Sequence, residues 1–256
     1  MVYARVQVGR RRFYALIEGD VVYPIIGTPF GRHCPTGQRF PLSEVRLLAP
    51  VSPRKILAAA VNYRSHLEQS RSLLGDAPAR PELFLKPGSA VIGPDEPIVL
   101  PRDAGRVDYE GELVAIIGRK CRGVSPEEAL SYVLGYTCGN DVSARAWQRN
   151  DLQWWRAKGA DTFAPLGPWI VTYLQPSRPL LRTRLNGRVV QEASTAELIY
   201  DVAQLVSFAS QVMTLEPGDA IYTGTPGTTG PLSPGDVVEV EIEGIGVLRN
   251  PVMAME

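Results

Sequence analysis

Short runs of apolar and β-branched residues, each closed by a turn-forming residue, recur along almost the whole chain and limit what it can fold into. In the first fifty residues, YARVQV and FYALIEGDVVYPI alternate apolar and polar side chains, with turn residues at Gly9 and at Gly19 to Asp20. The 256 residues include 24 glycines and 22 prolines, which disfavours a bundle of long helices. The chain is therefore predicted to consist mainly of strands.

The order of the segments predicts the fold class. ILAAAVNY (56–63) and LFLKP (83–87) indicate buried strands, whereas the apolar spacing over 195–213, behind Ser194 and Glu197 as a capping box, predicts the longest helix. Strands, a few helices and then further strands predict an α+β fold in which β structure dominates. The proline-bearing linker LLAPVSPRK divides a small N-terminal β subdomain, residues 1–52, from a larger domain, residues 53–256.

Composition excludes several classes of partner. Lys and Arg number 27, as do Asp and Glu, so no net field favours nucleic acid or an anionic membrane. No stretch approaches 18 apolar residues, and the first residues lack the apolar core of a signal peptide. Three cysteines without a CxxC pair favour a reducing compartment. We expect a cytoplasmic protein with a small-molecule partner.

Residues 107–117, VDYEGELVAII, carry two carboxylates inside a stretch that otherwise indicates a strand with Gly111 as a weak point. Glu110 and Glu112 would share one face roughly 7 Å apart, where partial burial makes their repulsion costly unless a cation lies between them. Asp141, which ends an apolar strand, is the best candidate for a third ligand. Such oxygen ligands favour Mg²⁺, with Mn²⁺ or Ca²⁺ as alternatives. Taken alone, a Glu-x-Glu pair is more often the solvated face of a strand.

Three sequence blocks in a fixed order resemble the fumarylacetoacetate hydrolase family: the Glu-x-Glu pair, NDVSARAWQ (140–148) and WWRAKGADTFAPLGPW (154–169). The resemblance extends through NYRSH (62–66), PGDAIYTGTPG (217–227) and the closing PGDVVEVEIEGIGVLRNPV, and it covers roughly residues 51–253. It implies a mixed-strand β-roll core, a homodimer, and one Mg²⁺ held by Glu110, Glu112 and Asp141.

The resemblance also implies the chemistry. Family members act on 2-oxo acids, which chelate the metal through the carboxylate and the 2-oxo or enol oxygen. We expect hydrolysis of the C–C bond of an acylpyruvate, such as fumarylpyruvate, in aromatic catabolism. The alternatives on the same site are isomerisation of 2-hydroxyhepta-2,4-diene-1,7-dioate and decarboxylation or tautomerisation of oxaloacetate. An alternative of another class is a 2-oxo acid binding protein without turnover.

Four further residues correspond to family residues near the substrate. Lys158 corresponds to a lysine beside the substrate, Arg145 and Gln148 to residues near the metal and substrate, and Thr225 to a threonine that contacts the substrate. Each also has a structural alternative: Lys158 a solvated surface residue, Arg145 and Gln148 a brace for their own helix, and Thr225 a plain turn.

His66, in NYRSH, corresponds to a histidine that activates water together with a glutamate in hydrolytic members. Many members carry that glutamate three residues later, where this chain has Gln69, with Glu68 one place before it. Residues two apart do not share a helix face. Either Glu68 reaches His66 by a different backbone path, or the pair is incomplete and hydrolysis is weaker than the alternative reactions.

Lys86 and Arg64 add positive charge near the expected site. This charge would suit the second carboxylate of a dicarboxylate substrate, although both could equally be surface residues. The expected partner is therefore a small 2-oxo acid or dicarboxylate.

Overall fold

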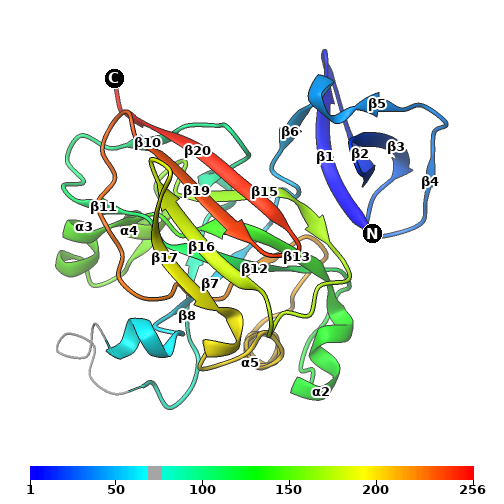
Figure 1. Cartoon of the computed structure of the whole chain (residues 1–256). Helices are drawn as coiled ribbons and strands as arrows, with labels where there is room; N and C mark the ends of the chain where they lie inside the picture. The colour runs from blue at the N-terminus through cyan, green and yellow to red at the C-terminus, as the bar shows by residue number, and fades with distance from the viewer. Residues whose placement is uncertain (69–76) are drawn as a thin grey trace.

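One large sheet organises the chain in the computed structural model, which describes residues 1–68 and 77–256 (Figure 1). Across these residues the path of the sheet runs β4-β3-β2-β1-β15-β13-β12-β18-β7-β8, and β5, β6 and β9 pair alongside it. The bounds are β1 (Val2–Val8), β2 (Arg11–Glu18), β3 (Val21–Gly27), β4 (His33–Pro35), β5 (Phe40–Pro41), β6 (Arg46–Leu48), β7 (Ile56–Ala60), β8 (Glu82–Lys86), β9 (Val91–Ile92), β12 (Gly111–Ile117), β13 (Val133–Asn140), β15 (Ala164–Val171) and β18 (Ala220–Tyr222).

A second sheet lies against the first (Figure 1). Its order is β10 (Ile98–Leu100), β20 (Gly246–Ala254), β19 (Val237–Ile242), β16 (Leu180–Leu185) and β17 (Arg188–Ser194), and β11 (Val107–Asp108) pairs separately with β14 (Ser143–Ala144). Leu113 of β12, Leu181 of β16 and Val240 of β19 belong to one buried apolar cluster between the sheets. Parallel pairs, β7 with β18 and β10 with β20, occur among antiparallel ones, so the strands are mixed.

The central strand β12 is buried on both faces. Leu113 and Ala115 belong to the cluster between the sheets, whereas Val114 and Ile116 belong to a second cluster on the opposite face. A strand covered on both sides can be apolar without alternation, which explains the continuous run that follows Glu112.

The helices are short. They are residues 64–68, α2 (Pro126–Ala129), α3 (Arg145–Asn150), α4 (Trp155–Gly159) and α5 (Val202–Val212), with 3₁₀ turns at Leu42–Glu44, Gly88–Ala90, Leu130–Tyr132 and Thr195–Glu197. In the described part of the chain, none is long and apolar enough to cross a membrane. The predicted α+β fold dominated by strands is confirmed.

The helix predicted over 195–213 is wrong in its first turns. Ser194 does form a capping box with Glu197, but it caps only a 3₁₀ turn, and α5 begins at Val202 behind a second capping box made by Asp201 and Gln204. Between the two, Leu198 pairs with Tyr63 as an isolated β-bridge. This tertiary pairing holds the backbone extended and overrides the local helical spacing.

Asp201→Ala is expected to lower the free energy of unfolding by about 1 kcal/mol, the usual effect of losing an N-cap side chain. The Asp201 carboxylate accepts the Gln204 backbone N–H at 2.8 Å, and alanine leaves that donor without its cap. Urea unfolding followed by circular dichroism measures the change. Ser194→Ala is the matched control, because Ser194 caps only the short 3₁₀ turn. If this variant lost as much unfolding free energy as Asp201→Ala, the cap by Asp201 would have no specific effect on the stability of α5.

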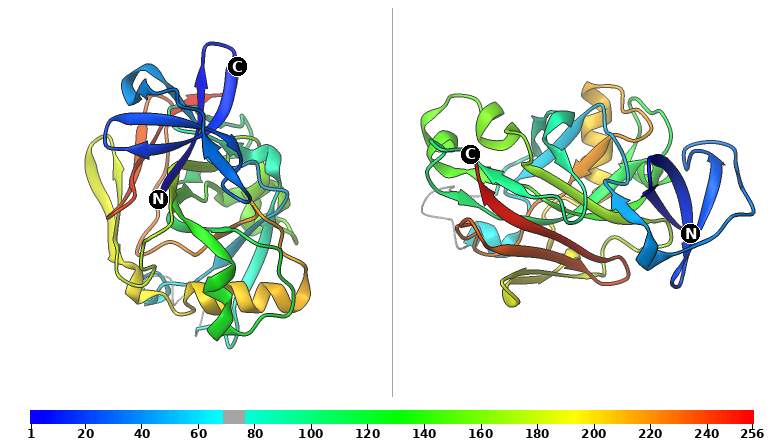
Figure 2. Two further views of the ribbon diagram at one scale, coloured as in Figure 1. Left: turned by 90° about the vertical axis from the view of Figure 1, so that its right-hand side faces the viewer. Right: turned by 90° about the horizontal axis from the view of Figure 1, so that it is seen from above.

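The first six strands form a unit of their own that projects from the rest (Figure 2). Ala4, Val6, Ala15, Ile17 and Val22 make its small apolar core. It is also continuous with the large sheet, because β1 pairs with the end of β15. The division into residues 1–52 and 53–256 stays a prediction.

Candidate active site

The strand predicted over residues 107–117 is interrupted at Tyr109 and Glu110, so the prediction of one continuous strand is wrong here. The Glu110 N–H donates to the side-chain Oδ1 of Asn140 at 2.8 Å, and the Asp141 N–H donates to the Glu110 carbonyl at 2.9 Å. These two bonds join the start of β12 to the end of β13. They bring Glu110 beside Asp141, which lies 31 positions later in the sequence.

Gly111 is required by the packing of the two sheets rather than by a turn. A Cβ at this position would lie 2.0 Å from the hydroxyl oxygen of Thr183 on β16. Only glycine lets the second sheet approach so closely at the point where the acidic residues gather.

The structure brings together the three carboxylates that the sequence predicts to be metal ligands. One oxygen each from Glu110, Glu112 and Asp141 lies within 4.8 Å of the others, and all three residues are buried. Such a cluster of like charges is unfavourable unless cations compensate it.

Glu112 is the least compensated member. Its Oε2 accepts the Gly224 backbone N–H at 2.7 Å, and its Oε1 is buried with no hydrogen-bond partner among the described residues. Burial, reinforced by the charges of Asp141 and Glu110, raises the pKa of Glu112 well above its usual range. An unpartnered oxygen among carboxylates fits the donor set of a hard divalent cation.

Lys158 is buried on α4 and lies between the other two acids. Its Nζ is 2.8 Å from Glu110 Oε2 and 2.6 Å from Asp141 Oδ2. Burial alone would lower the pKa of Lys158, but the charges of Asp141 and Glu110 outweigh it and raise that pKa. The side chain also lines the adjoining cavity, so the structural alternative of a solvated surface lysine is wrong.

Lys86 lies at the carboxylate cluster, and its structural alternative as a surface residue is wrong. It is fully buried and bonds to Asp141, and it is not among the cavity-lining residues that the structure describes. It therefore contacts a carboxylate of the protein rather than solvent or the cavity. Burial lowers its pKa, and the charge of Asp141 only partly offsets this effect.

Arg145, at the start of α3, is held by four partners. Its guanidinium contacts Asp108 at 2.9 Å, Glu110 at 2.6 Å, Gln148 at 2.8 Å and Thr229 at 2.7 Å. Arg145 and Gln148 both line the cavity and also bond to each other along α3. Their structural role in the helix and a role in ligand binding are therefore compatible.

Asp108, Arg106 and Thr229 were missed by the sequence reasoning. Asp108 is buried and accepts two bonds from Arg106, at 2.7 and 3.0 Å, and one from the Thr229 hydroxyl at 2.8 Å. The sequence contained one signal for Asp108: in an extended segment, residues 108, 110 and 112 would point their side chains to the same face.

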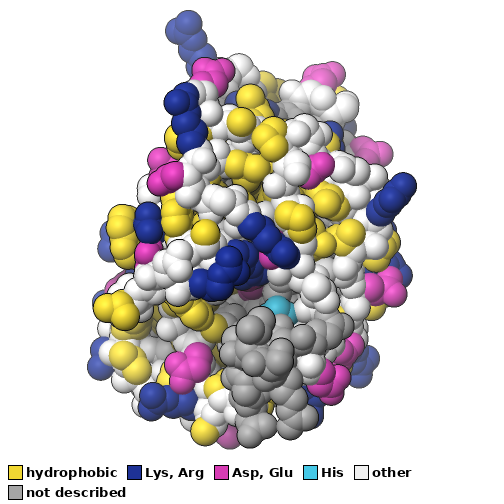
Figure 3. Space-filling view, turned by 90° about the vertical axis from the view of Figure 1, so that its left-hand side faces the viewer, with side chains coloured by type: hydrophobic (Ala, Val, Ile, Leu, Met, Phe, Trp, Pro, Cys, Tyr) yellow, Lys and Arg dark blue, Asp and Glu magenta, His cyan; other side chains and the backbone are white. Residues whose placement is uncertain are grey.

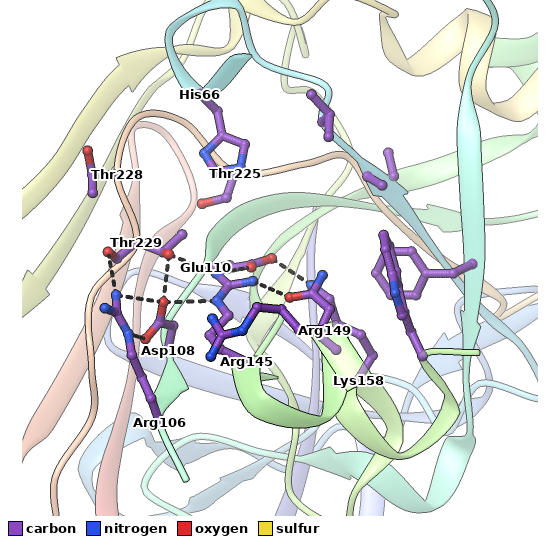
Figure 4. Close-up of a pocket in the computed structure, with 16 residues that line it drawn as sticks. His66, Arg106, Asp108, Glu110, Arg145, Arg149, Lys158, Thr225, Thr228 and Thr229 are labelled. Carbon is purple, nitrogen blue, oxygen red and sulfur yellow. Dashed lines mark hydrogen bonds and ion pairs between the residues drawn. The ribbon is translucent and has the colours of Figure 1, made fainter. Parts of the chain in front are cut away.

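His66 lines the cavity on the side opposite Arg145 and Lys158 in the view of Figure 4. Its Nδ1 lies 2.5 Å from the Gly227 carbonyl, which can only accept, so Nδ1 carries the proton and Nε2 is left as the acceptor. The Ser65 hydroxyl accepts the Gly227 N–H at 3.3 Å and fixes the same loop. A backbone carbonyl thus orients this imidazole.

Glu68 and Arg64 are exposed, and neither is among the described residues that line the cavity. The pairing predicted between Glu68 and His66 has no support in this arrangement. Gln69 lies outside the described residues.

Thr225 is tied into the cavity wall. Its hydroxyl donates to the Gly111 carbonyl at 2.9 Å and accepts from the Gln191 side chain at 2.9 Å. The preceding Gly224 has φ +101° and leaves no room for a Cβ beside Asn62. The segment is more than a plain turn, because it joins the wall to β12 and β17.

The cavity beside these residues measures about 580 Å³. Charged side chains make one part of its wall, and Phe84, Trp154 and Ala59–Val61 make an apolar part. Basic side chains and a histidine flank its opening (Figure 3). Val61 has φ +51°, a strained conformation for a β-branched residue, and the neighbouring Asn62 holds it by bonds to Tyr200 and Thr223.

Two family models match the chain. Residues 55–253 match the model described as fumarylacetoacetate (FAA) hydrolase C-terminal, and residues 1–50 match the model described as Rv2993c-like, N-terminal.

Several known proteins are similar over most of their length. The structure of 5-carboxymethyl-2-hydroxymuconate delta-isomerase from Mycobacterium smegmatis is 49% identical, with 100% of each chain covered and a TM-score of 0.93. Maleylpyruvate hydrolase from Sphingobium sp. SYK-6, in complex with manganese (II) ion and pyruvate, is 32% identical, with 100% of each chain covered and a TM-score of 0.83. Mitochondrial oxaloacetate tautomerase fahd2 from Xenopus laevis is 40% identical over 225 residues, which are 82% of this chain and 69% of that protein.

Proposed function

Because the chain belongs to the fumarylacetoacetate hydrolase family, we propose that it is a magnesium-dependent enzyme that hydrolyses the C–C bond of an acylpyruvate, such as fumarylpyruvate, in aromatic catabolism. The observation that carries this proposal is the cavity itself: His66, with Nε2 available as a base, lines the same cavity as Glu110 and Lys158 of the carboxylate cluster. A base and a cationic site on one cavity are what hydrolysis of a 2-oxo acid requires.

Glu110, Glu112 and Asp141 would hold the metal ion. Their oxygen-only donor set, together with the unpartnered Glu112 oxygen, fits Mg²⁺, and Mn²⁺ or Ca²⁺ accept the same kind of ligand. When bound, such an ion supplies Lewis acidity toward the oxygens of the substrate.

Lys158, Gln148 and Arg145 bind and orient the substrate. The Lys158 ammonium is fixed by two carboxylates, so it provides positive charge where negative charge develops on the 2-oxo oxygen, at no cost in reorganisation. Gln148 accepts from Arg145 through Oε1, which turns its amide NH₂ group toward a substrate oxygen. Arg145 is held by Asp108 and positions both Gln148 and Glu110.

His66 is the base. Its Nε2 takes a proton from water while the resulting hydroxide adds to the distal carbonyl carbon of the substrate. The C–C bond then breaks and its electron pair passes to the pyruvate half, which is released as pyruvate after it gains a proton. The Gly227 carbonyl keeps the imidazole in the required tautomer.

Isomerisation, tautomerisation or decarboxylation is the second candidate, and the exposure of Glu68 favours it. If Glu68 does not pair with His66, the imidazole that has gained a proton lacks that stabilising carboxylate, which weakens water activation more than simple proton transfer to or from carbon. The similar isomerase and tautomerase named above suit this alternative.

Incubation with acylpyruvates and with oxaloacetate, with and without EDTA, tests the proposal. Pyruvate plus a free acid, lost with EDTA and restored by Mg²⁺, is the expected result, whereas pyruvate plus CO₂ from oxaloacetate alone would favour the second candidate. His66→Asn should lower hydrolysis about a hundredfold, because a general base typically contributes that much or more. Ligand-dependent thermal stabilisation without turnover of any substrate would instead indicate a binding protein.

The cytoplasmic location and the homodimer are part of this proposal and rest on composition and on the family resemblance.

A further inference from the structure

Helix α3 places two arginines on one face of the cavity. Arg145 and Arg149 are four residues apart, so they lie on the same side of the helix, with a rise of about 6 Å between them. Both line the cavity and lie on the side away from His66 in the view of Figure 4. The first arginine contacts Glu110 of the carboxylate cluster, and the second lies one turn farther along the helix.

The two arginines differ in how their charges are compensated. Arg145 bonds to Asp108 and Glu110, and Arg106 forms a two-bond pair with Asp108. Lys158 bonds to Glu110 and Asp141. Arg149 is exposed and has neither an ion pair nor a hydrogen bond with residues 1–68 or 77–256. Among the cavity-lining cations that the structure describes, it alone has an unused guanidinium.

The two residues predicted to bind a second substrate carboxylate are not among the described residues that line the cavity. Lys86 is buried against Asp141, and Arg64 is not among the cavity-lining residues described. Arg149 offers what they lack, because a free guanidinium on a cavity wall can bind a carboxylate through two parallel hydrogen bonds. Phe84 and Trp154, with ring centroids 5.6 Å apart, provide an apolar part of the same cavity wall.

We propose that Arg149 binds a distal carboxylate of the substrate, so that the preferred substrates are 2-oxo acids with a second carboxylate at the far end of the chain. This inference rests on the proposed function, because the 2-oxo acid end must bind at the carboxylate cluster for the far end to reach Arg149. Arg149 is a specificity-determining residue, which acts on the choice of substrate rather than on the reacting atoms.

Two ligands of equal carbon number, 2-oxoadipate and 2-oxohexanoate, test the proposal by isothermal titration calorimetry with Mg²⁺ present. They share the 2-oxo acid end and differ in the distal carboxylate. The parent protein is expected to bind 2-oxoadipate about tenfold more tightly. Arg149→Gln should bring the ratio of the two dissociation constants close to one, and Arg149→Lys should restore part of it.

Arg122→Gln is the matched control, because it removes an exposed arginine that does not line the cavity and should leave the ratio as in the parent protein. Thermal melts show whether the Arg149 variants are folded. If both ligands bind the parent equally, or if Arg149→Gln keeps the preference, the inference is overturned while the proposed function stands. If neither ligand binds in the presence of Mg²⁺, the proposed function fails and this inference fails with it.

Discussion

Glu112→Gln is expected to lower turnover at least about a thousandfold and to leave the metal-free protein no less stable than its parent. The buried Glu112 carboxyl has a raised pKa, and glutamine closely matches the shape of the protonated acid. Glutamine, however, offers a divalent ion one neutral oxygen in place of a negative charge. Thermal melts with and without Mg²⁺, together with turnover, measure both effects. Stabilisation of the variant by Mg²⁺ as large as that of the parent would contradict the assignment of Glu112 as a ligand.

The pH dependence of stability gives the same variant a second test. Because the pKa of Glu112 is raised in the folded protein, the folded state keeps a proton that the unfolded chain releases above its ordinary pKa of 4.5. The stability from this group is complete below that pH and is lost as pH rises through the folded pKa. In the absence of metal, the free energy of unfolding of Glu112→Gln should therefore increase relative to that of the parent protein as pH rises. Curves of unfolding free energy against pH that run parallel for the variant and its parent would refute this. Glu128→Gln, at an exposed position, is the control, and its curve is expected to stay parallel to that of the parent.

Lys86→Met is expected to lower the free energy of unfolding by about 3 kcal/mol, near the lower end of the range for removing one partner of a buried ion pair. Methionine nearly preserves the length and volume of the side chain, but it leaves Asp141 with Lys158 as its remaining cation. The lower end applies because Lys158 still compensates part of that charge. Urea unfolding of the metal-free protein gives the value.

A double-mutant cycle with Asp141→Asn separates the ion pair from packing. Removing both charges leaves no uncompensated partner, so the double variant should be less destabilised than the sum of the two single variants. An additive result would show that the ion pair between Lys86 and Asp141 contributes nothing to the stability of the fold. Lys55→Met, which removes the partly exposed partner of Asp219, is the matched control and should have a smaller effect.

The family, the strand-dominated fold and the enzymatic class could be predicted because they depend on short local patterns. The sequence alone shows these patterns: Gly and Pro at turns, apolar runs such as 111–117, and the three motif blocks. The convergence of Glu110, Glu112 and Asp141 could also be anticipated, since the first two are only two positions apart and the third directly follows an apolar strand. The roles of the individual site residues stay predictions.

Features set by distant contacts could not be predicted. Leu198 is held extended by its bridge to Tyr63, which no helical pattern can reveal. Lys86 is a buried partner of Asp141 across 55 positions of sequence, although a lysine in FLKP has the appearance of a surface residue. The Gly227 carbonyl lies 161 positions from His66, so the group that orients the imidazole could be found only in three dimensions.

The sequence by itself determined which groups the site can contain: three carboxylates for a hard cation, one histidine and several basic residues. Only the tertiary structure decided which charges pair. Lys86 and Lys158 compensate protein carboxylates, whereas Glu112 has no ion pair with a cation, and Arg149 none with an anion, within residues 1–68 and 77–256. The physical reason is that the interaction of two charges depends on their separation and burial in space, and sequence position specifies neither for residues on different strands.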